Sequence, residues 1–278
     1  MPRKALSYIA PLAVALIYHI SGANKKPDSA ICYNHMRRIL NILICAAKHF
    51  GIELNSRQLE QFSCYHAELA CWNRHFNLTA ITEPDEVKLK HFADSLSVIP
   101  ALDKKILDGH VDIIDIGTGA GFPGIPLKIA LPDIHLSLVD STRKKLRFVE
   151  HVINKLQLEN VFVVPGRAEE LAHDPDYRER YQVVLSRAVA KLPVLAELCL
   201  PFCKINGVFV AYKKGEITEE VASAHSAVNT LGGKIRGIQP VTVPGLDDNR
   251  FHIVIDKFSP SPLKHPRKPG VPLKNPLS

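Results

Sequence analysis

A glycine-rich turn at residues 115–121 carries the strongest chemical signal in the sequence. It connects a short apolar run to a segment with helical character. Glycines at such a junction let the backbone turn sharply and let a ligand approach the main chain closely. Gly119-x-Gly121-x-x-Gly124 also fits the fingerprint of nicotinamide dinucleotide sites, although that pattern alone is weak support. Asp115 favours another cofactor, because it lies in the expected strand immediately before the first glycine, Gly117, where a carboxylate would repel a pyrophosphate.

Polar residues also follow the next two strand-like runs. Asp140 ends the second run, where its carboxylate is placed to accept the hydroxyls of a ribose. The alternative for Asp140 is an N-cap of the following helix. After the third run, the backbone of Ala168 and Glu169 is placed to meet an adenine ring, or this segment is an ordinary helix start with acids favoured by the dipole. The carboxylate at Asp140 is shared by NAD and S-adenosylmethionine sites, so it supports a nucleoside without deciding between them. The acid at Asp115 favours S-adenosylmethionine, because in methyltransferases that position serves the cationic amino-acid part of the cofactor.

Cationic residues follow the fourth and fifth runs. We interpret Arg187 as an active-site cation, with a structural salt bridge as the alternative. Lys213 and Lys214 add positive charge at the same edge of the sheet. Enzymes that methylate exocyclic amines usually carry an Asn/Asp-Pro-Pro-aromatic stretch near Arg187, and this chain has none. An exocyclic amine is therefore not the expected acceptor.

These residues need a sheet to bring them to one edge. Apolar runs alternate with amphipathic segments from residue 111 onward, which predicts a doubly wound, mainly parallel α/β sheet. Two final runs separated by a short turn suggest an antiparallel pair, by analogy with methyltransferases. The expected strands are Val111–Ile116, Ile134–Val139, Val161–Val164, Gln182–Leu185, Gly207–Tyr212, Ile235–Val243 and Phe251–Ile255. The expected helices between them include Arg143–Leu156, Leu192–Cys203 and Glu216–Leu231.

The composition suits a globular enzyme that meets a polyanion. The chain has 278 residues, of which 35 are Lys or Arg and 28 are Asp or Glu. A basic surface favours nucleic acid, although it is also a common solubilising feature. The six cysteines form no C-x-x-C pair and the histidines show no zinc spacing, so we expect reduced thiols, no metal and a cytoplasmic protein without membrane association.

We divide the chain into four segments. Residues 1–35 are an uncertain extension, because the apolar stretch 5–20 resembles a signal peptide, a non-native extension ahead of Met36, or an extra helix. The latter two interpretations are favoured. Residues 36–100 are expected to form helices, one of them capped by Asn55 or Ser56 and another at 85–98. The catalytic domain covers 101–257, and 258–278 form a basic, proline-rich tail that cannot form a core element.

RNA contact is expected from basic residues near the carboxyl ends of the strands and in the tail. The tail is interpreted either as a solvated end or as an extended arm on phosphate. Removing it is then expected to weaken the salt dependence of RNA binding and leave cofactor binding intact. The candidates for RNA binding are Lys144, Lys145, Arg147, Lys213, Lys214, Arg250, Arg267 and Lys268.

Several motifs, in this order, make residues 36–278 resemble the bacterial ribosomal RNA guanine-N7 methyltransferase family known as RsmG or GidB. The motifs are Trp72-Asn73-x-x-Phe76-Asn77-Leu78-Thr79, His91-x-x-Asp94-Ser95, the glycine turn through Leu127, Asp140-Ser141, Ser186-Arg187-Ala188, Lys214-Gly215 and Arg250. The tail also resembles the basic end of longer members, which favours the phosphate-binding interpretation.

The resemblance implies a class I, Rossmann-like fold with a seven-stranded, mainly parallel sheet. It also implies S-adenosylmethionine-dependent methylation of N7 of one guanine in 16S ribosomal RNA. The implied cofactor contacts are Asp115, Gly117, Gly119, Phe122, Asp140, Ala168, Glu169 and Arg187. Arg187 and Lys214 are the expected catalytic residues; they would position the reactants, because guanine N7 carries no proton and needs no general base.

The chain differs from other family members at three positions, and other functions are also considered. Ala120 and Phe122 stand where other members often have Pro and Leu, and Lys90 stands where an Arg often precedes the histidine. The other functions considered are methylation of a small molecule or protein, nicotinamide-dependent oxidoreduction, and RNA binding without catalysis. We expect a monomer that acts on 16S ribosomal RNA or on the small-subunit particle.

Overall fold

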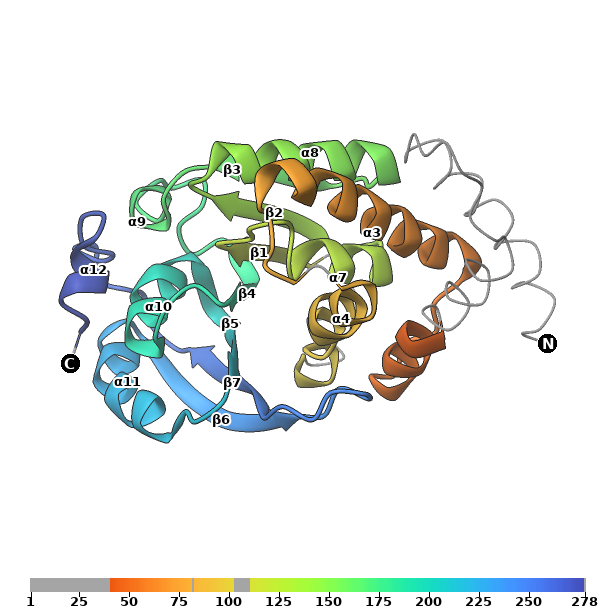
Figure 1. The fold of residues 1–278 in the computed structure, drawn as a ribbon. Helices are drawn as coiled ribbons and strands as arrows, with labels where there is room; N and C mark the ends of the chain where they lie inside the picture. The colour runs from red at the N-terminus through yellow and green to blue at the C-terminus, as the bar shows by residue number, and fades with distance from the viewer. Residues whose placement is uncertain (1–40, 82, 103–110, 278) are drawn as a thin grey trace, which may run out of the picture.

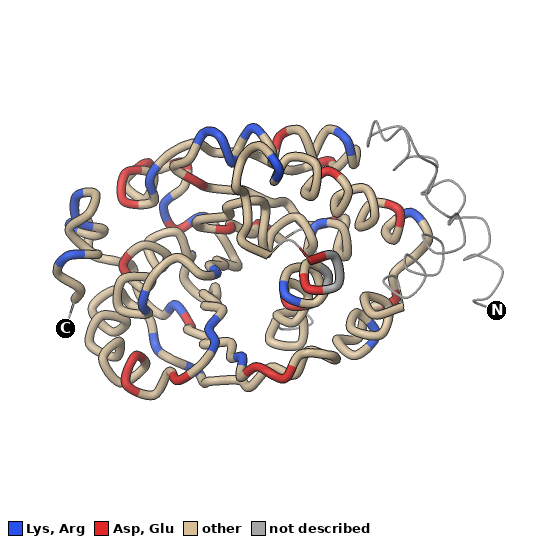
Figure 2. Tube along the Cα trace, in the orientation of Figure 1, with Lys and Arg blue, Asp and Glu red and all other residues tan. Residues whose placement is uncertain are grey.

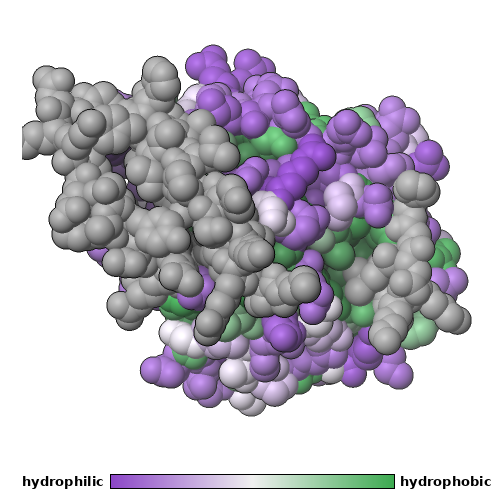
Figure 3. All heavy atoms as spheres, turned by 90° about the vertical axis from the view of Figure 1, so that its right-hand side faces the viewer, coloured by the Kyte–Doolittle hydropathy of each residue, from purple (hydrophilic) through white to green (hydrophobic). Residues whose placement is uncertain are grey.

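The computed structural model describes residues 41–81, 83–102 and 111–277 (Figure 1). The apolar stretch 5–20, and with it the three interpretations of the N-terminus, lies outside the described residues. None of the helices in the described part of the chain is long and apolar enough to span a membrane. On the face shown in Figure 3, hydrophilic residues make up most of the surface that the described residues contribute.

A seven-stranded sheet forms the centre of the molecule, in the order β3-β2-β1-β4-β5-β7-β6. β1 to β5 are parallel, whereas β7 runs antiparallel to both β5 and β6. This confirms the predicted class I methyltransferase architecture. The strands are β1 Asp112–Ile116, β2 His135–Asp140, β3 Val161–Pro165, β4 Tyr181–Arg187, β5 Cys203–Lys214, β6 Gly233–Val241 and β7 Arg250–Lys257.

Helices cover both faces of the sheet, because alternate residues of each strand point to opposite sides. Ile113 of β1 belongs to the core under α3, α7 and α8, whereas Ile114 belongs to the core under α10 and α11. Figure 1 shows these helices in two layers with the sheet between them. Their bounds are α3 Ser56–Phe76, α7 Gly124–Ala130, α8 Arg143–Leu156, α9 Ala168–Leu171, α10 Leu192–Cys199 and α11 Thr218–Thr230.

The expected helix Leu192–Cys203 is too long at its C-terminal end. It ends at Cys199, and a 3-10 turn at Leu200–Phe202 leads directly into β5. Pro201 lies in that turn. Its ring removes a backbone N–H and disfavours a continuing α-helix.

α3 connects the N-terminal helical segment to the glycine turn. Asn55 caps the helix and forms a capping box with Gln58, as one of the two caps expected from the sequence. The Gln58 side chain also donates to two carbonyl oxygens at the end of α7. Further along α3, the hydroxyl of Tyr65 donates a 2.5 Å hydrogen bond to the carbonyl of Ala120. The helix therefore holds the loop that a cofactor would contact.

The segment expected as one helix over 85–98 is composite. It consists of α4 Pro84–Val87, a π-helix at Lys88–Ala93 and α5 Asp94–Leu96. A π-helical turn changes the phase of the side chains and is common at functional sites. Here it directs His91 and Asp94 towards the carboxyl end of β4.

The C-terminal tail packs against the domain, which corrects the expectation that it forms no core element. Ser261, His265 and Pro272 are buried, and a short helix, α12, covers Val271–Lys274. The carboxylate of Glu197 on α10 is fully buried and pairs with Arg267 at 2.6 Å. Composition did not predict this packing because it depends on a partner 70 residues away in the sequence.

Candidate active site

The glycine turn forms the floor of a cavity at the carboxyl end of the sheet. Gly117 and Gly119 have φ values of +76° and +60°, which L side chains rarely adopt. The Gly117 N–H donates to the carbonyl of Val139 on β2, and the Gly119 N–H donates to the Asp140 carboxylate at 2.9 Å. A Cβ added at Gly117 would lie 2.5 Å from a methyl of Val189. A side chain at Gly117 would therefore clash with Val189, so glycine leaves only backbone atoms at this point of the cavity wall.

Asp115 is fully buried beneath this turn. One of its carboxylate oxygens, Oδ2, accepts hydrogen bonds from the Thr118 hydroxyl at 2.7 Å and from the Gly124 N–H at 3.0 Å. The other, Oδ1, has no hydrogen-bond partner among the described residues. Burial raises the pKa of Asp115 to about 6, although these two hydrogen bonds oppose the shift. An orphaned buried carboxylate oxygen fits a cationic ligand, and S-adenosylmethionine carries such groups.

A cavity of about 360 Å³ lies above the turn and brings together four of the expected cofactor residues. Gly117, Asp140, Ala168 and Glu169 all line it. Its volume and its position outside the carboxyl ends of the parallel strands suit a nucleoside cofactor. Its lining also includes Lys145, Val189 and Val194, and from the tail Gly270, Pro272 and Leu273.

The tail residues of this wall were missed in the sequence. Gly270 N–H donates to the Glu169 carboxylate at 3.1 Å, which fixes the tail beside α9. Pro272 and Leu273 then face the cavity from α12. No local pattern marks these residues, because they follow a proline-rich stretch with no periodicity.

Asp140 shapes the site through both carboxylate oxygens. Oδ2 accepts the Gly119 N–H, and Oδ1 accepts the Thr142 N–H at 2.7 Å. The second bond resembles the N-cap alternative, but the N-cap residue of α8 is Thr142 and its side chain makes no capping bond. Each carboxylate oxygen has further acceptor capacity, so a ribose hydroxyl is compatible with both bonds.

A second group of expected residues forms a cluster beside the cavity. Arg187 ends β4 and points towards the π-helix, where it pairs with the buried Asp94 at 2.8 Å and donates to the carbonyl of Lys90. The Phe122 ring stacks on His91 with a centroid distance of 4.5 Å, and the Arg187 guanidinium lies 5.2 Å from the same ring. Neither Arg187 nor Phe122 is among the residues lining the cavity. The next residue, Ala188, has a φ of +57°, a strained conformation typical of functional sites.

His91 is neutral in this cluster and has both nitrogens engaged. Burial, reinforced by the charges of Arg187 and Arg250, lowers its pKa to about 3. Since Arg187 only donates, Nδ1 of His91 accepts its hydrogen bond at 3.1 Å. Nε2 therefore carries the proton and donates to the Thr79 hydroxyl at 2.9 Å. Asp94 could have been found in the sequence, since His91 and Asp94 are spaced to share one helical face.

Three cations expected to bind RNA are held in ion pairs. Arg250 pairs with Asp94 at 2.7 Å and with Asp248 at 2.6 Å, and Arg267 pairs with Glu197. Lys213 pairs with Glu220. These contacts make the three residues structural in this state, and none presents a free charge to solvent.

Other expected cations are accessible. Lys144, Arg147 and Lys268 are exposed, and Lys145 is partly exposed at the cavity. Lys214 is 71% exposed and lies 3.9 Å from Asp248. Lys214 is thus far less constrained than Arg187, the other residue expected to position the reactants.

Comparisons with known proteins agree with this geometry. The family model described as rRNA small subunit methyltransferase G matches residues 58–253. A ribosomal RNA small subunit methyltransferase G from Acetivibrio thermocellus is 47% identical over 241 residues, which are 87% of this chain and 98% of the relative. A protein of the same description from Dehalococcoides mccartyi is 46% identical over 238 residues, which are 86% of this chain and the whole of the relative.

Solved structures with lower similarity were also found. A 16S rRNA (adenine-N1)-methyltransferase mutant from Catenulisporales acidiphilia has a TM-score of 0.46 and 14% identity, covering 58% of this chain and 94% of its own. A precorrin-6y C5,15-methyltransferase from Geobacter metallireducens has a TM-score of 0.42 and 17% identity, covering 56% of this chain and 87% of its own.

The match to curated relatives and to the family model confirms the resemblance seen in the motifs, and with it the expectation of an S-adenosylmethionine-dependent methyltransferase. This chain belongs to the GidB family, rRNA small subunit methyltransferase G.

Proposed function

We propose that the protein transfers a methyl group from S-adenosylmethionine to N7 of one guanine in 16S ribosomal RNA. The names of its relatives support the substrate class, since they are described as methyltransferases of the small-subunit ribosomal RNA. The observation that carries the choice of N7 is the absence of a free general base around Arg187, within the residues that the structure describes.

The cluster beside the cavity holds two groups that could accept a proton, and both are occupied. Both carboxylate oxygens of Asp94 are engaged, since Oδ2 pairs with Arg187 and Oδ1 pairs with Arg250. His91 already accepts a hydrogen bond at Nδ1 and donates from Nε2. A nucleophile that must lose a proton needs a base within hydrogen-bonding reach. Guanine N7 has no proton to lose, so it suits a site built in this way.

The cofactor supplies an electrophilic methyl group on a sulfonium. We propose that Asp115 balances the positive charge of the bound cofactor, that Gly117 and Gly119 present backbone to it, and that Asp140 accepts its ribose. Ala168 and Glu169 are proposed to contact its adenine. Each proposal is supported by the position of the residue in or directly beneath the cavity.

Arg187 is proposed to position the guanine or the cofactor carboxylate, with no role in proton transfer. Methyl transfer moves positive charge onto the guanine ring, so an uncompensated cation near N7 would slow the reaction. The ion pair with Asp94 reduces this penalty. The main contribution of the site is then orientation of two reactants, which is worth up to about 7–11 kcal/mol in well-oriented reactions. Phe122 is proposed to hold His91 and Arg187 in place by stacking.

We also propose that the enzyme acts as a monomer in the cytoplasm, on 16S ribosomal RNA or on the small-subunit particle. Lys144, Lys145, Arg147 and Lys268 remain the candidates for phosphate contact, because they are at least partly exposed and form no ion pair with a carboxylate of the described residues. Lys214 is proposed as a weaker positioning residue at the same rim.

The proposal is tested by incubating the purified protein with labelled S-adenosylmethionine and with small-subunit RNA or particles from a strain lacking the corresponding enzyme. Mapping of the labelled base is expected to find one guanine modified at N7. Label on another atom would refute the argument from the missing base. Cofactor binding with no transfer to either form of the RNA would refute the RNA assignment.

A further inference from the structure

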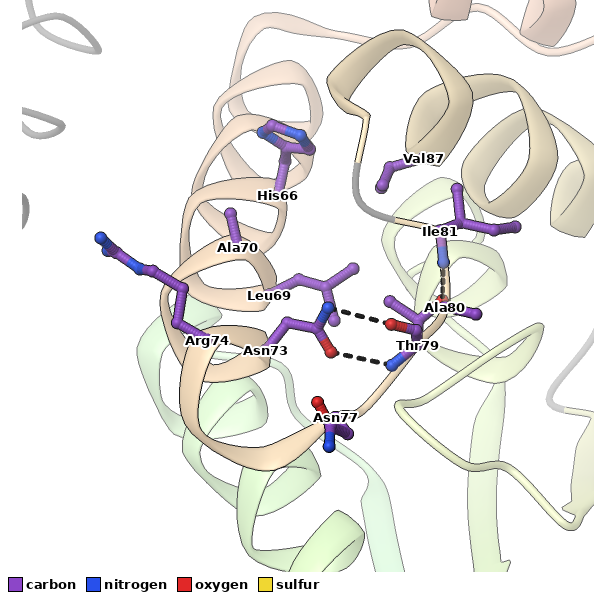
Figure 4. A pocket seen from close by; sticks show the side chains of 10 residues that line it. All are labelled: His66, Leu69, Ala70, Asn73, Arg74, Asn77, Thr79, Ala80, Ile81 and Val87. Carbon is purple, nitrogen blue, oxygen red and sulfur yellow. Dashed lines mark hydrogen bonds between the residues drawn. The ribbon is translucent and has the colours of Figure 1, made fainter.

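A second cavity of about 580 Å³ lies between the C-terminal half of α3 and a wall formed by residues 79–81 and Val87 (Figure 4). It shares no lining residue with the cofactor cavity. Its volume is within the range of pockets that hold small organic ligands. Leu69 and Ala70 contribute to one wall from α3, and Ile81 and Val87 contribute to the opposite wall.

Polar groups at this cavity offer hydrogen bonds to a ligand. The Asn73 side chain joins the two walls, since it donates to the Thr79 carbonyl and accepts from the Thr79 N–H, both at 2.9 Å (Figure 4). The exposed Asn77, with a left-handed φ of 48°, has no side-chain hydrogen bond with the described part of the chain. The Thr79 hydroxyl accepts from Ile81 N–H and from His91, so its own proton remains available.

Thr79 also connects this cavity to the active site. His91 bonds Thr79 through one nitrogen and Arg187 through the other. One residue, His91, therefore links the wall of the second cavity to the ion pair between Arg187 and Asp94. A ligand in this cavity would lie next to the cluster that positions the acceptor.

A basic strip with an exposed aromatic ring runs past the cavity. We define the strip as Arg74, Phe76, Lys144 and Arg147. Phe76 is 37% exposed, and the Lys144 ammonium lies 4.7 Å from its ring. Arg74 lines the cavity and points outward from α3 (Figure 4), and basic residues recur along α8 (Figure 2). None of the three cations pairs with a carboxylate of the described residues.

The adjoining Lys145 lines the cavity above the glycine turn, which is the proposed cofactor cavity. Positive charge therefore continues from one cavity to the other. The combination of cations, an exposed aromatic ring and a cavity suits single-stranded RNA, because phosphates bind cations while unstacked bases pack on aromatic rings and into pockets. A membrane or an acidic peptide would use the cations but would not need the donors inside the cavity.

We propose that the second cavity holds one unpaired nucleobase of the RNA substrate, next to the nucleotide that is methylated. The strip then binds the flanking phosphates and stacks a neighbouring base on Phe76. This inference rests on the proposed function and deepens it, since it names the surface and the single-stranded form of the RNA that the surface recognises. The Asn77 amide and the Thr79 hydroxyl would donate to acceptor atoms of that base.

The first test of this proposal introduces a bulky side chain into the second cavity. Ala70→Phe places a ring at the cavity wall without removing a hydrogen bond, and Ala222→Phe makes the same change at an exposed position of α11. Dissociation constants for small-subunit RNA and for S-adenosylmethionine are measured for both variants and the wild type. Ala70→Phe is expected to weaken RNA binding by about tenfold or more, a typical consequence of losing one base contact. Cofactor binding and the Ala222→Phe control should stay within about twofold of wild type.

Two further measurements keep the test independent of the folding of one variant. Asn77→Gly keeps the left-handed backbone but removes the amide, and it should weaken RNA binding about fivefold. Trp72 is the single tryptophan of the chain and lies 5.3 Å from the Phe76 ring. A short single-stranded RNA should therefore quench its fluorescence, and Phe76→Leu should remove most of that quenching.

The outcomes separate this inference from the proposed function. Wild-type protein that methylates the RNA, combined with unchanged RNA affinity in Ala70→Phe and Asn77→Gly, would overturn the cavity proposal alone. Weaker binding to particles with unchanged binding to protein-free RNA would also overturn it, because the cavity would then receive a ribosomal protein. Wild-type protein that binds S-adenosylmethionine but no ribosomal RNA would overturn both proposals.

Discussion

Asp115 provides the sharpest test of the cofactor site. Its pKa is raised from 3.8 to about 6 in the cofactor-free protein because the carboxyl group is buried and Oδ1 has no partner. The folded state therefore binds this proton more tightly than the unfolded chain. This group makes stability rise as the pH falls from about 6 to about 4, and at pH 7 it costs about 3 kcal/mol, since one pKa unit is worth about 1.4 kcal/mol.

A cationic cofactor should reverse this preference. If it binds the charged carboxylate, the protein must lose the Asp115 proton before binding at low pH. The dissociation constant for S-adenosylmethionine should then rise about tenfold between pH 7 and pH 5. Asp115→Asn should bind the cofactor weakly at both pH values, and its cofactor-free form should be at least as stable as wild type at pH 7, because the substitution removes a buried charge.

Isothermal titration calorimetry at pH 5 and 7, with denaturant unfolding of the cofactor-free proteins, checks both effects. Asp176→Asn serves as the control, because Asp176 is an exposed aspartate distant in sequence from the glycine turn. Equal cofactor affinity at the two pH values in the wild type, or wild-type affinity in Asp115→Asn, would refute the role given to this carboxylate.

Three further predictions follow from the same structure. Asp94→Asn leaves two arginines without their shared carboxylate, so denaturant unfolding should show a loss of about 3–5 kcal/mol and turnover should fall; an intact kcat would contradict the positioning role. Removing residues 271–278 takes away one wall of the cofactor cavity, and calorimetry should show roughly tenfold weaker cofactor binding, equivalent to about 1.4 kcal/mol, whereas the sequence alone suggested no effect. Gly117→Ala should weaken cofactor binding, whereas Gly215→Ala, with a similar φ and no atom within 4 Å of the added Cβ, should reduce stability without changing the cofactor dissociation constant.

Local sequence patterns located the strands and the residues at their carboxyl ends. The expected helix Arg143–Leu156 matches α8 at both ends, because its apolar spacing and its position after Asp140 are local features. Asp115, Gly117 and Asp140 could be proposed as site residues for the same reason, since a glycine turn and a strand-terminal carboxylate are visible within a few residues. Parallel strands then place such positions at one edge of the sheet.

The sequence did not show the surroundings of residues that contact distant parts of the chain. Arg250 and Arg267 were expected on RNA, yet each is paired with a carboxylate that lies far away in the sequence or in another loop. The segment 85–98 was expected as one regular helix, but it contains a π-helical turn whose residues form hydrogen bonds with Arg187, which ends β4. A charged residue looks the same in a sequence whether its partner is a phosphate or a buried glutamate.

The sequence by itself determined the fold class and the cofactor type and located the carboxylates at the ends of the strands, because periodicity, glycine spacing and motif order are encoded over short stretches. Only the tertiary structure decided that the tail lines the proposed cofactor cavity, that Asp94 pairs with two arginines, and that a second cavity lies beside a basic strip. Those features arise from burial and ion pairing between segments far apart in the chain, whose free energies depend on which groups meet after folding.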